Sequence, residues 1–181
     1  MPLTPLHYPV AYILHKLNRR LSLPGLAIGS MFPDLEIPVI IMLSEPLDLN
    51  RLVLHSLLGA VTIGTLLSVF LTVWIYPFFV SSFFKVDKQK VKEKCRLSLG
   101  LIFSVFLGNI SHVLLDLVNH LENPVFWPFS QFIPSPICLA LGLQNASLIA
   151  HTVLIVLFVA IFISQRGNLW ENLLVGDLEK V

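Results

Sequence analysis

Three potential metal ligands stand at helical spacing within one apolar stretch of this chain. His112, Asp116 and His120 follow one another at intervals of four residues. Because an α-helix turns by about 100° per residue, steps of four and eight residues advance these side chains by only ~40° and ~80°, so all three share one face. Imidazole nitrogens and carboxylate oxygens form the mixed ligand set that zinc and related divalent ions favour. The spacing therefore predicts a helix face that can coordinate a metal.

The rest of the chain has the composition of a membrane protein. Of its 181 residues 55% are hydrophobic and 13% are charged, and the mean hydropathy is +0.81. A soluble domain would carry about 25% charged residues. An ionisable group at membrane depth costs roughly 2.5–3.5 kcal/mol, so a cluster of such groups indicates function. The net charge of +1 provides no global basic field, which argues against a nucleic-acid partner.

The pattern of apolar segments predicts an all-α integral membrane bundle with about four spanning helices and a short N-terminal helix. About 20 residues cross the hydrocarbon core, and the last two segments are long enough to do so. We expect the short helix at 5–17 and the spanning segments at about 22–43, 52–76, 97–121 and 144–164.

Two features modify this pattern. Proline and two carboxylates in the stretch from Phe32 to Glu36 predict a break in the second segment, and residues 78–84 are expected along the membrane surface. A polar connection from Ser44 to Arg51 precedes the third segment. No internal repeat or linker divides the chain, so we predict a single domain over residues 1–181.

Basic residues predict the orientation. The stretch from Lys85 to Arg96 contains six basic and two acidic residues, whereas residues 122–143 contain no lysine or arginine. By the positive-inside rule the basic loop 85–96 is cytoplasmic. Cys95 and Cys138 would then lie on opposite sides of the membrane and could not pair.

Counting residues from basic boundary marks places several polar groups at one depth. His7, Asp34 and His112 lie twelve, fourteen and sixteen residues from Arg19, Arg20 and Arg96, and His151 lies fifteen from Arg166. At ~1.5 Å per residue this is roughly 18–24 Å from the inner boundary, in the outer half of a ~30 Å core. We therefore predict a cavity open towards the outer leaflet, lined by six candidate metal ligands: His7, Asp34, His55, His112, Asp116 and His120.

Simpler explanations remain open for individual residues. Asp34 could cap the helix that resumes after the break, with Glu36 as a first-turn carboxylate favoured by the helix dipole. His7 and His55 stand near the starts of segments, where interfacial polar residues are common. His151 is isolated among apolar residues, which favours a packing role, or contact with a metal ligand, over direct binding of a metal.

The chain resembles the family of membrane-bound metal-dependent hydrolases, the YdjM-like integral membrane proteins. The matching pieces cover roughly residues 1–130: His7 after a Met-Pro-Leu-Thr-Pro start, Gly29-Ser30-Met31-Phe32-Pro33-Asp34, His55-Ser56-Leu57-Leu58-Gly59, and the stretch from Gly108 to Asp116. The order His, Asp, His, then His-x-x-x-Asp is also distantly similar to zinc-dependent phospholipase C. That likeness implies metal ligation by the six candidates. The downstream His-x-x-x-Glu of the soluble enzymes is missing, because Ile155 stands four residues after His151.

These observations predict a divalent-metal-dependent hydrolase of a phosphoester bond in a lipid-like substrate, with membrane lipid as its partner. The cofactor would be one to three divalent ions, with zinc favoured by the ligands. We expect Asp34, Glu36 and Asp116 to serve catalysis, the two aspartates by bridging ions and Glu36 as a base. Two alternatives are a non-catalytic protein that transports or senses a metal ion or proton, and a structural membrane protein.

Overall fold

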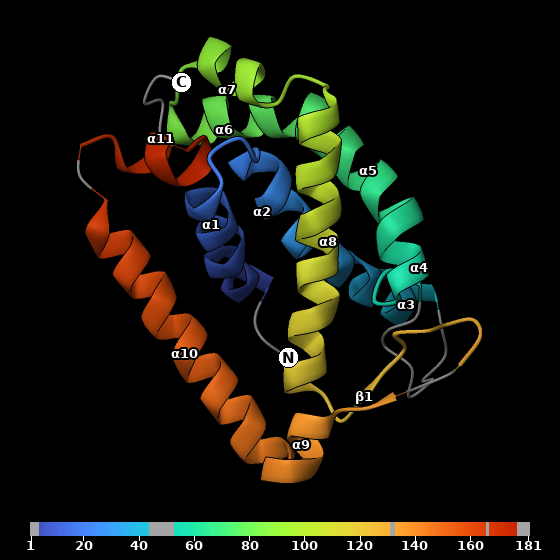
Figure 1. Ribbon diagram of the computed structural model, residues 1–181. Helices are drawn as coiled ribbons and strands as arrows, with labels where there is room; N and C mark the ends of the chain where they lie inside the picture. The colour runs from blue at the N-terminus through green and yellow to red at the C-terminus, as the bar shows by residue number, and fades with distance from the viewer. Residues whose placement is uncertain (1–3, 44–52, 131–132, 166, 177–181) are drawn as a thin grey trace.

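The structure, a computed structural model, describes residues 4–43, 53–130, 133–165 and 167–176, so the polar connection at 44–51 and Arg166 lie outside it. The described residues are mostly helical (Figure 1). By length and composition, four stretches of them can cross a membrane: Leu23–Met42, Leu57–Phe84, Leu99–Asn119 and Leu143–Ser164. The predicted all-α membrane bundle with a short N-terminal helix is confirmed.

The elements follow one another from a 3₁₀ turn at the N-terminal end to a short helix at the C-terminal end. In chain order they are η1 (Thr4–His7), α1 (Tyr8–Leu17), α2 (Leu23–Met31), the 3₁₀ turn η2 (Phe32–Leu35), α3 (Glu36–Leu43), α4 (Leu57–Gly59), the π-helical turn η3 (Ala60–Gly64), α5 (Thr65–Phe70), the π-helical turn η4 (Leu71–Ile75), α6 (Tyr76–Phe84), α7 (Lys88–Lys94), α8 (Leu99–Asn119), β1 (Glu122–Asn123), β2 (Ile133–Pro134), α9 (Pro136–Leu141), α10 (Leu143–Ser164) and α11 (Leu169–Leu174).

The second spanning segment is broken where the sequence predicts it. The regular helix α2 ends at Met31, the 3₁₀ turn η2 follows, and α3 resumes at Glu36. Pro33 has no backbone N–H to continue the α-helical hydrogen bonding, which explains the tighter turn. The break places Asp34 inside the bundle rather than at its end.

The third segment is longer than predicted. Helical structure continues from Leu57 through Phe84 instead of ending near residue 76. Pro77 occupies the first turn of α6, where its missing N–H would have no intrahelical partner in any case. In Figure 1 this last part, α6, bends across the end of the bundle at a wide angle to α8. The extension is therefore a bend and not a longer crossing.

Helices α2 and α8 touch through their backbones at the centre of the molecule. A Cβ atom on Gly29 would overlap the Val105 carbonyl oxygen, and one on Gly108 would overlap the Leu26 carbonyl oxygen. The Cβ atom on Gly108 would also lie only 3.0 Å from the Cα of Gly29. Only glycine permits this approach, which brings the polar face of α8 directly against the end of α2.

A cap of short helices closes the end of the bundle that carries the basic residues. Val80 of α6, Val91 of α7 and Val175 after α11 pack in one buried apolar cluster. Lys90 of α7 forms a 2.8 Å ion pair with Glu171 of α11, and the hydrogen bond that Lys90 donates to this carboxylate raises the pKa of Lys90. We call the end of the bundle that α6, α7 and α11 form the basic end. The loop predicted at 85–96 therefore contains a helix, α7, with Asp87 as its N-cap.

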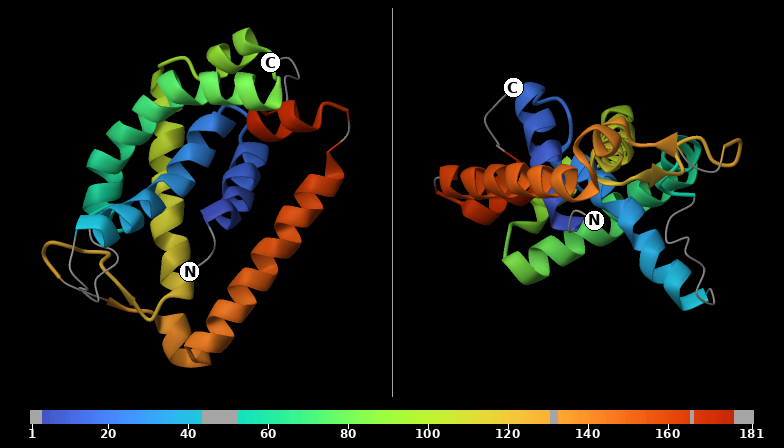
Figure 2. Two further views of the ribbon diagram at one scale, coloured as in Figure 1. Left: turned by 180° about the vertical axis from the view of Figure 1, so that it is seen from behind. Right: turned by 90° about the horizontal axis from the view of Figure 1, so that it is seen from below.

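Helix α10 stands apart from the other spanning helices. Only 17% of its most apolar window is buried, and it slants away from α8 towards the basic end (Figure 2). At the opposite end α9 joins it to the short hairpin β1–β2, which pairs Asn123 with Ile133. Most of α10 thus faces outward, as a lipid-exposed helix would.

Candidate metal centre

Histidine and aspartate side chains from four separate segments meet beside α8. His7 ends η1, Asp34 lies in η2, His55 precedes α4, and His112 and Asp116 lie on α8. None of these five side chains belongs to a residue more than 7% exposed. His120, the C-cap residue of α8, is partly buried. The structure therefore brings all six candidate ligands of the sequence into one region.

Four of the ligand atoms form a closed ring of alternating nitrogen and oxygen. His55 Nε2 lies 3.7 Å from Asp34 Oδ1 and 3.7 Å from Asp116 Oδ2. His112 Nε2 lies 3.6 Å from each of the same two oxygens. These separations are longer than hydrogen bonds. Ligands around a zinc ion with bonds of about 2.1 Å lie about 3.4 Å apart in tetrahedral geometry, and the four edges of the ring are close to this value.

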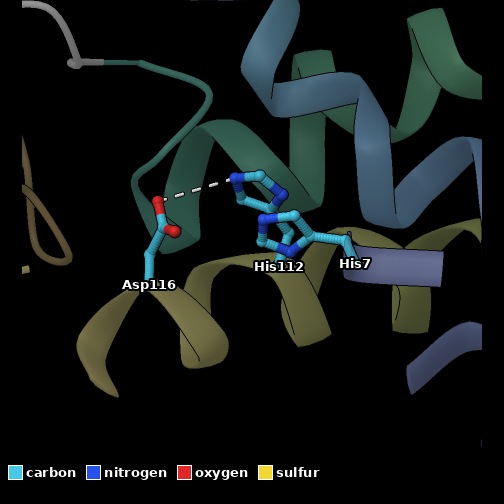
Figure 3. A group of neighbouring side chains, drawn as sticks. All are labelled: His7, His112 and Asp116. Atoms are coloured by element: carbon cyan, nitrogen blue, oxygen red, sulfur yellow. Dashed lines mark ion pairs between the residues drawn. The ribbon is translucent and has the colours of Figure 1, made fainter. Parts of the chain in front are cut away.

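His7 and His120 extend this ring on two sides. The His7 ring stacks on the His112 ring with centroids 4.1 Å apart, and both point into the space that Asp116 faces (Figure 3). Ligand atoms of His7, His112 and Asp116 all lie within 4.8 Å of one another, as do those of Asp34, His55 and His112. His120 Nε2 lies 3.6 Å from Asp116 Oδ1, the oxygen that does not belong to the ring.

Neighbouring groups orient the two histidines of the ring. His55 Nδ1 is 2.9 Å from Glu36 Oε2, and His112 Nδ1 is 2.8 Å from the Ser30 carbonyl oxygen. Both partners are acceptors, so each histidine donates from Nδ1 and turns the lone pair of Nε2 towards the ring. Outer partners of this kind fix the tautomer of metal-binding histidines in known sites.

Glu36 is held from both sides. Its Oε1 accepts backbone hydrogen bonds from Val53 at 2.7 Å and Leu54 at 3.1 Å, while Oε2 faces His55. The carboxylate therefore links α3 to the turn that carries His55. These contacts favour an orienting role for Glu36, whereas the sequence suggested a base.

Buried polar atoms in and around the ring fit a cation. Both ring nitrogens of His7, His112 Nε2 and Asp34 Oδ2 have no hydrogen-bond partner among the described residues. A buried polar group without a partner is costly, and carboxylates close together repel. A divalent ion bonded to one His7 nitrogen, to His112 Nε2 and to Asp34 would lower both costs. The donor set, imidazole with carboxylate, is the one that zinc uses.

Local sequence explains how each ligand is held. Ser56 caps α4 by accepting from Gly59 N at 3.0 Å and donates to the Val53 carbonyl oxygen, which fixes the turn around His55. The backbone contact between Gly29 and Gly108 brings the Ser30 carbonyl within reach of His112, one helical turn further along α8. The motifs that contain these glycines thus place the ligands by close packing.

The other histidines lie away from the ring. His151 Nδ1 bonds to the Ser147 carbonyl oxygen of its own helix at 2.7 Å, and His15 Nδ1 bonds to the Leu21 carbonyl oxygen at 2.8 Å. His15 is buried, although it follows the apolar stretch near the basic turn. The sequence did not predict that Ser30 orients His112. Ser30 acts through its backbone carbonyl, so its side-chain type carries no information about this role.

Comparison with known proteins places the chain in a family but does not extend to an activity. No curated protein and no solved structure is detectably similar to it. None of these comparisons shows similarity to phospholipase C or to a metal-dependent hydrolase. The family model of the YdjM inner membrane protein matches residues 7–175, a range that includes all six candidate ligands. The chain therefore belongs to the YdjM inner membrane protein family.

Proposed function

We propose that this membrane protein is a divalent-metal-dependent hydrolase that cleaves a phosphoester bond in a lipid-like substrate. The observation that carries the proposal is the buried ring of His55, His112, Asp34 and Asp116, whose edges measure 3.6–3.7 Å. Structural polar contacts would close to hydrogen-bond distance, whereas these side chains keep the spacing of ligands around a shared ion.

The ring and its two neighbours would hold one to three ions, with zinc favoured. When bound, a divalent ion polarises a phosphoryl oxygen and lowers the pKa of water towards ~7. Asp116 presents Oδ2 to the ring and Oδ1 to His120, which suits a carboxylate bridging two ions. Asp34 is a second bridging candidate. Glu36 keeps His55 in the tautomer whose Nε2 can bind the ion.

An apolar pocket whose wall includes residues next in sequence to the site supports a lipid-like substrate. It measures about 410 Å³, lies between α10, α11 and the N-terminal helix, and includes Pro5, Tyr8 and Met31 in its wall. Pro5 lies two residues from His7, and Met31 follows Ser30. A hydrocarbon chain in this pocket would run along spanning helices while the polar part of the same molecule reaches the ring. Substrate would then arrive laterally from the bilayer.

Charge supports an orientation for this site. The basic end carries α7 and its lysines, which by the positive-inside rule would face the cytoplasm. The ring lies along α8 well beyond its start at Leu99, since His112 is thirteen residues further along. We therefore place the proposed site towards the outer leaflet.

Metal analysis of purified protein tests the proposal. Detergent-solubilised protein should contain zinc or another divalent ion in stoichiometric amount, and a His112→Ala/Asp116→Ala variant should lose it. His151→Ala is the matched control, because this histidine bonds within its own helix away from the ring. Folded wild-type protein that stays free of metal after reconstitution with divalent ions would exclude the metal centre.

Activity is measured on the same three proteins with phospholipids and phosphoesters in mixed micelles. Hydrolysis by the wild type and His151→Ala, with loss in the double variant and after chelation, is the expected pattern. Metal-loaded protein without turnover on any phosphoester class would leave the centre intact and refute the hydrolase assignment.

A second candidate, passage of a metal ion or proton, is favoured by buried polar groups between the ring and the basic end. Asn109 donates to Ser68 Oγ at 3.4 Å, and its Oδ1 has no hydrogen-bond partner among the described residues. Ser104, closer to the basic end, donates to the Gly100 carbonyl oxygen of its own helix. Metal or proton flux into proteoliposomes, lost on Asn109→Leu, would favour passage over hydrolysis.

A further inference from the structure

A second pocket lies at the basic end, where the spanning helices α2 and α8 begin. Its volume is about 240 Å³. Its wall combines residues from the α1–α2 connection, from α7 and from the starts of both spanning helices. It therefore lies far along α8 from His112 and uses none of the candidate metal ligands.

Cationic side chains dominate this pocket. Arg19, Arg20, Lys94 and Arg96 line it, and among the described residues of its wall Glu93 is the one carboxylate. Glu93 also accepts a hydrogen bond from Gln89 at 3.1 Å. Arginine side chains stay charged at any physiological pH and present planar donor groups that match phosphate oxygens. The pocket thus concentrates positive charge around a hollow of molecular size.

Backbone dipoles add to the same field. Ser22 caps α2 and Ser98 caps α8, and both serines line the pocket, so the positive ends of two helices of nine and twenty-one residues lie beside it. Each helix start favours negative charge through its free N–H groups. The two helix starts add to the positive field of the four cationic side chains that line the pocket.

Hydrogen bonds hold the pocket in shape. Ser22 N donates to Ser104 Oγ at 2.8 Å, which ties the start of α2 to α8. Ser22 Oγ donates to the Lys94 carbonyl oxygen at 3.1 Å, which ties it to the end of α7. Segments that are distant in sequence therefore meet in a fixed arrangement, and little ordering is required when a ligand binds.

We propose that this pocket binds the phosphate of an anionic lipid headgroup. The starts of two spanning helices mark the membrane interface, which is where lipid phosphates lie. Leu21, Leu23 and Leu101 also line the pocket, and these apolar side chains suit the glycerol and upper acyl carbons of a lipid more than a free ion. Basic pockets between spanning helices are a known mode of anionic lipid recognition.

Native mass spectrometry of the full-length protein in detergent tests this site, with phosphatidylglycerol and phosphatidylcholine added at equal concentration. The pocket variant is Arg20→Gln/Lys94→Gln/Arg96→Gln. The matched control is Lys85→Gln/Lys88→Gln/Lys92→Gln, which removes the same charge from the same end outside the pocket. Single variants Arg20→Gln and Arg96→Gln replace the triple variant if its melting temperature falls.

Phosphatidylglycerol should bind in preference to phosphatidylcholine, and the pocket variant should weaken this binding roughly 10- to 100-fold while the control stays close to wild type. Equal weakening in both variants would reduce the effect to general surface charge and overturn the proposal. Binding of inorganic phosphate with no preference between the two lipids would overturn the lipid assignment. The readout requires no metal, so it is independent of the proposed hydrolase.

Discussion

At the scale of single residues, the contact between Glu36 and His55 offers the sharpest test of the metal centre. In a Glu36→Gln variant the amide oxygen can still accept from Val53 and Leu54, but an amide N–H would then face His55 Nδ1. His55 would have to accept at Nδ1 and carry its proton on Nε2, which faces the ring. We expect metal affinity to fall by about 10–100-fold with the fold retained, as competition with a zinc chelator would measure.

A matched control separates this effect from loss of charge. Glu93→Gln removes an exposed carboxylate at the basic end and should leave metal affinity unchanged. If Glu36→Gln bound metal as tightly as the wild type but lost turnover, Glu36 would act as a base and not as an orienting residue.

Cys95 provides a residue-scale test of the basic end. Its side chain is buried, and burial raises the pKa of the thiol to about 12. Since the thiolate is the reactive form, its fraction at neutral pH falls roughly a thousandfold relative to an ordinary thiol. In a Cys138→Ala background, maleimide should therefore label folded protein slowly and label it fully in denaturing detergent.

An exposed position on α7, the helix that Cys95 follows as its C-cap, gives the reference rate of maleimide labelling. Lys92→Cys, added to a chain that lacks both native cysteines, should react rapidly because Lys92 is exposed on α7. Equal labelling rates for Cys95 and for this engineered cysteine would mean that α6, α7 and α11 do not form the packed cap.

At the scale of elements, the crossing of α2 and α8 links packing to the site. Gly108→Ala would place a Cβ against the Leu26 carbonyl oxygen and the Ser30 nitrogen, so the helices must separate. We expect a loss of stability of about 1–3 kcal/mol, read from thermal unfolding, together with weaker metal binding because Ser30 moves away from His112.

Gly100→Ala tests the same change in the same helix without the crossing. A Cβ at Gly100 would meet no atom closer than Ser98 Oγ at 3.9 Å. This variant should be neutral or gain up to about 1 kcal/mol from better helix propensity. Similar melting temperatures for the two variants would contradict the close backbone approach.

At the scale of the whole molecule, a bound ion would join segments that are distant in sequence. His7, Asp34, His55 and His112 come from four different segments, so a metal that bonds to them stabilises the folded bundle over the unfolded chain. A ligand at a hundred times its dissociation constant adds about 2.7 kcal/mol. Chelation should therefore lower the melting temperature of the wild type and leave that of His112→Ala/Asp116→Ala unchanged.

The sequence alone determined the class of fold and the chemistry of the candidate ligands. Apolar segments of membrane-spanning length follow from composition, and the break near Pro33 follows from its missing N–H. The shared face of His112 and Asp116 follows from helical periodicity alone, because it depends on neighbours within one element. Depth counting also placed His7 and Asp34 near the level of that face, and in the structure all of these residues meet in one cluster.

Only the tertiary structure decided how these residues are arranged. The ring requires side chains from separate segments to approach within 4 Å, and their distances depend on how α2 crosses α8 at two glycines. The orienting contacts of His55 and His112 use a distant carboxylate and a backbone carbonyl, neither of which a spacing rule can pair. The basic pocket likewise joins residues from the α1–α2 connection, from the start of α8 and from Val175 after α11. Local periodicity sets which face a side chain occupies, whereas packing between elements sets what that face meets.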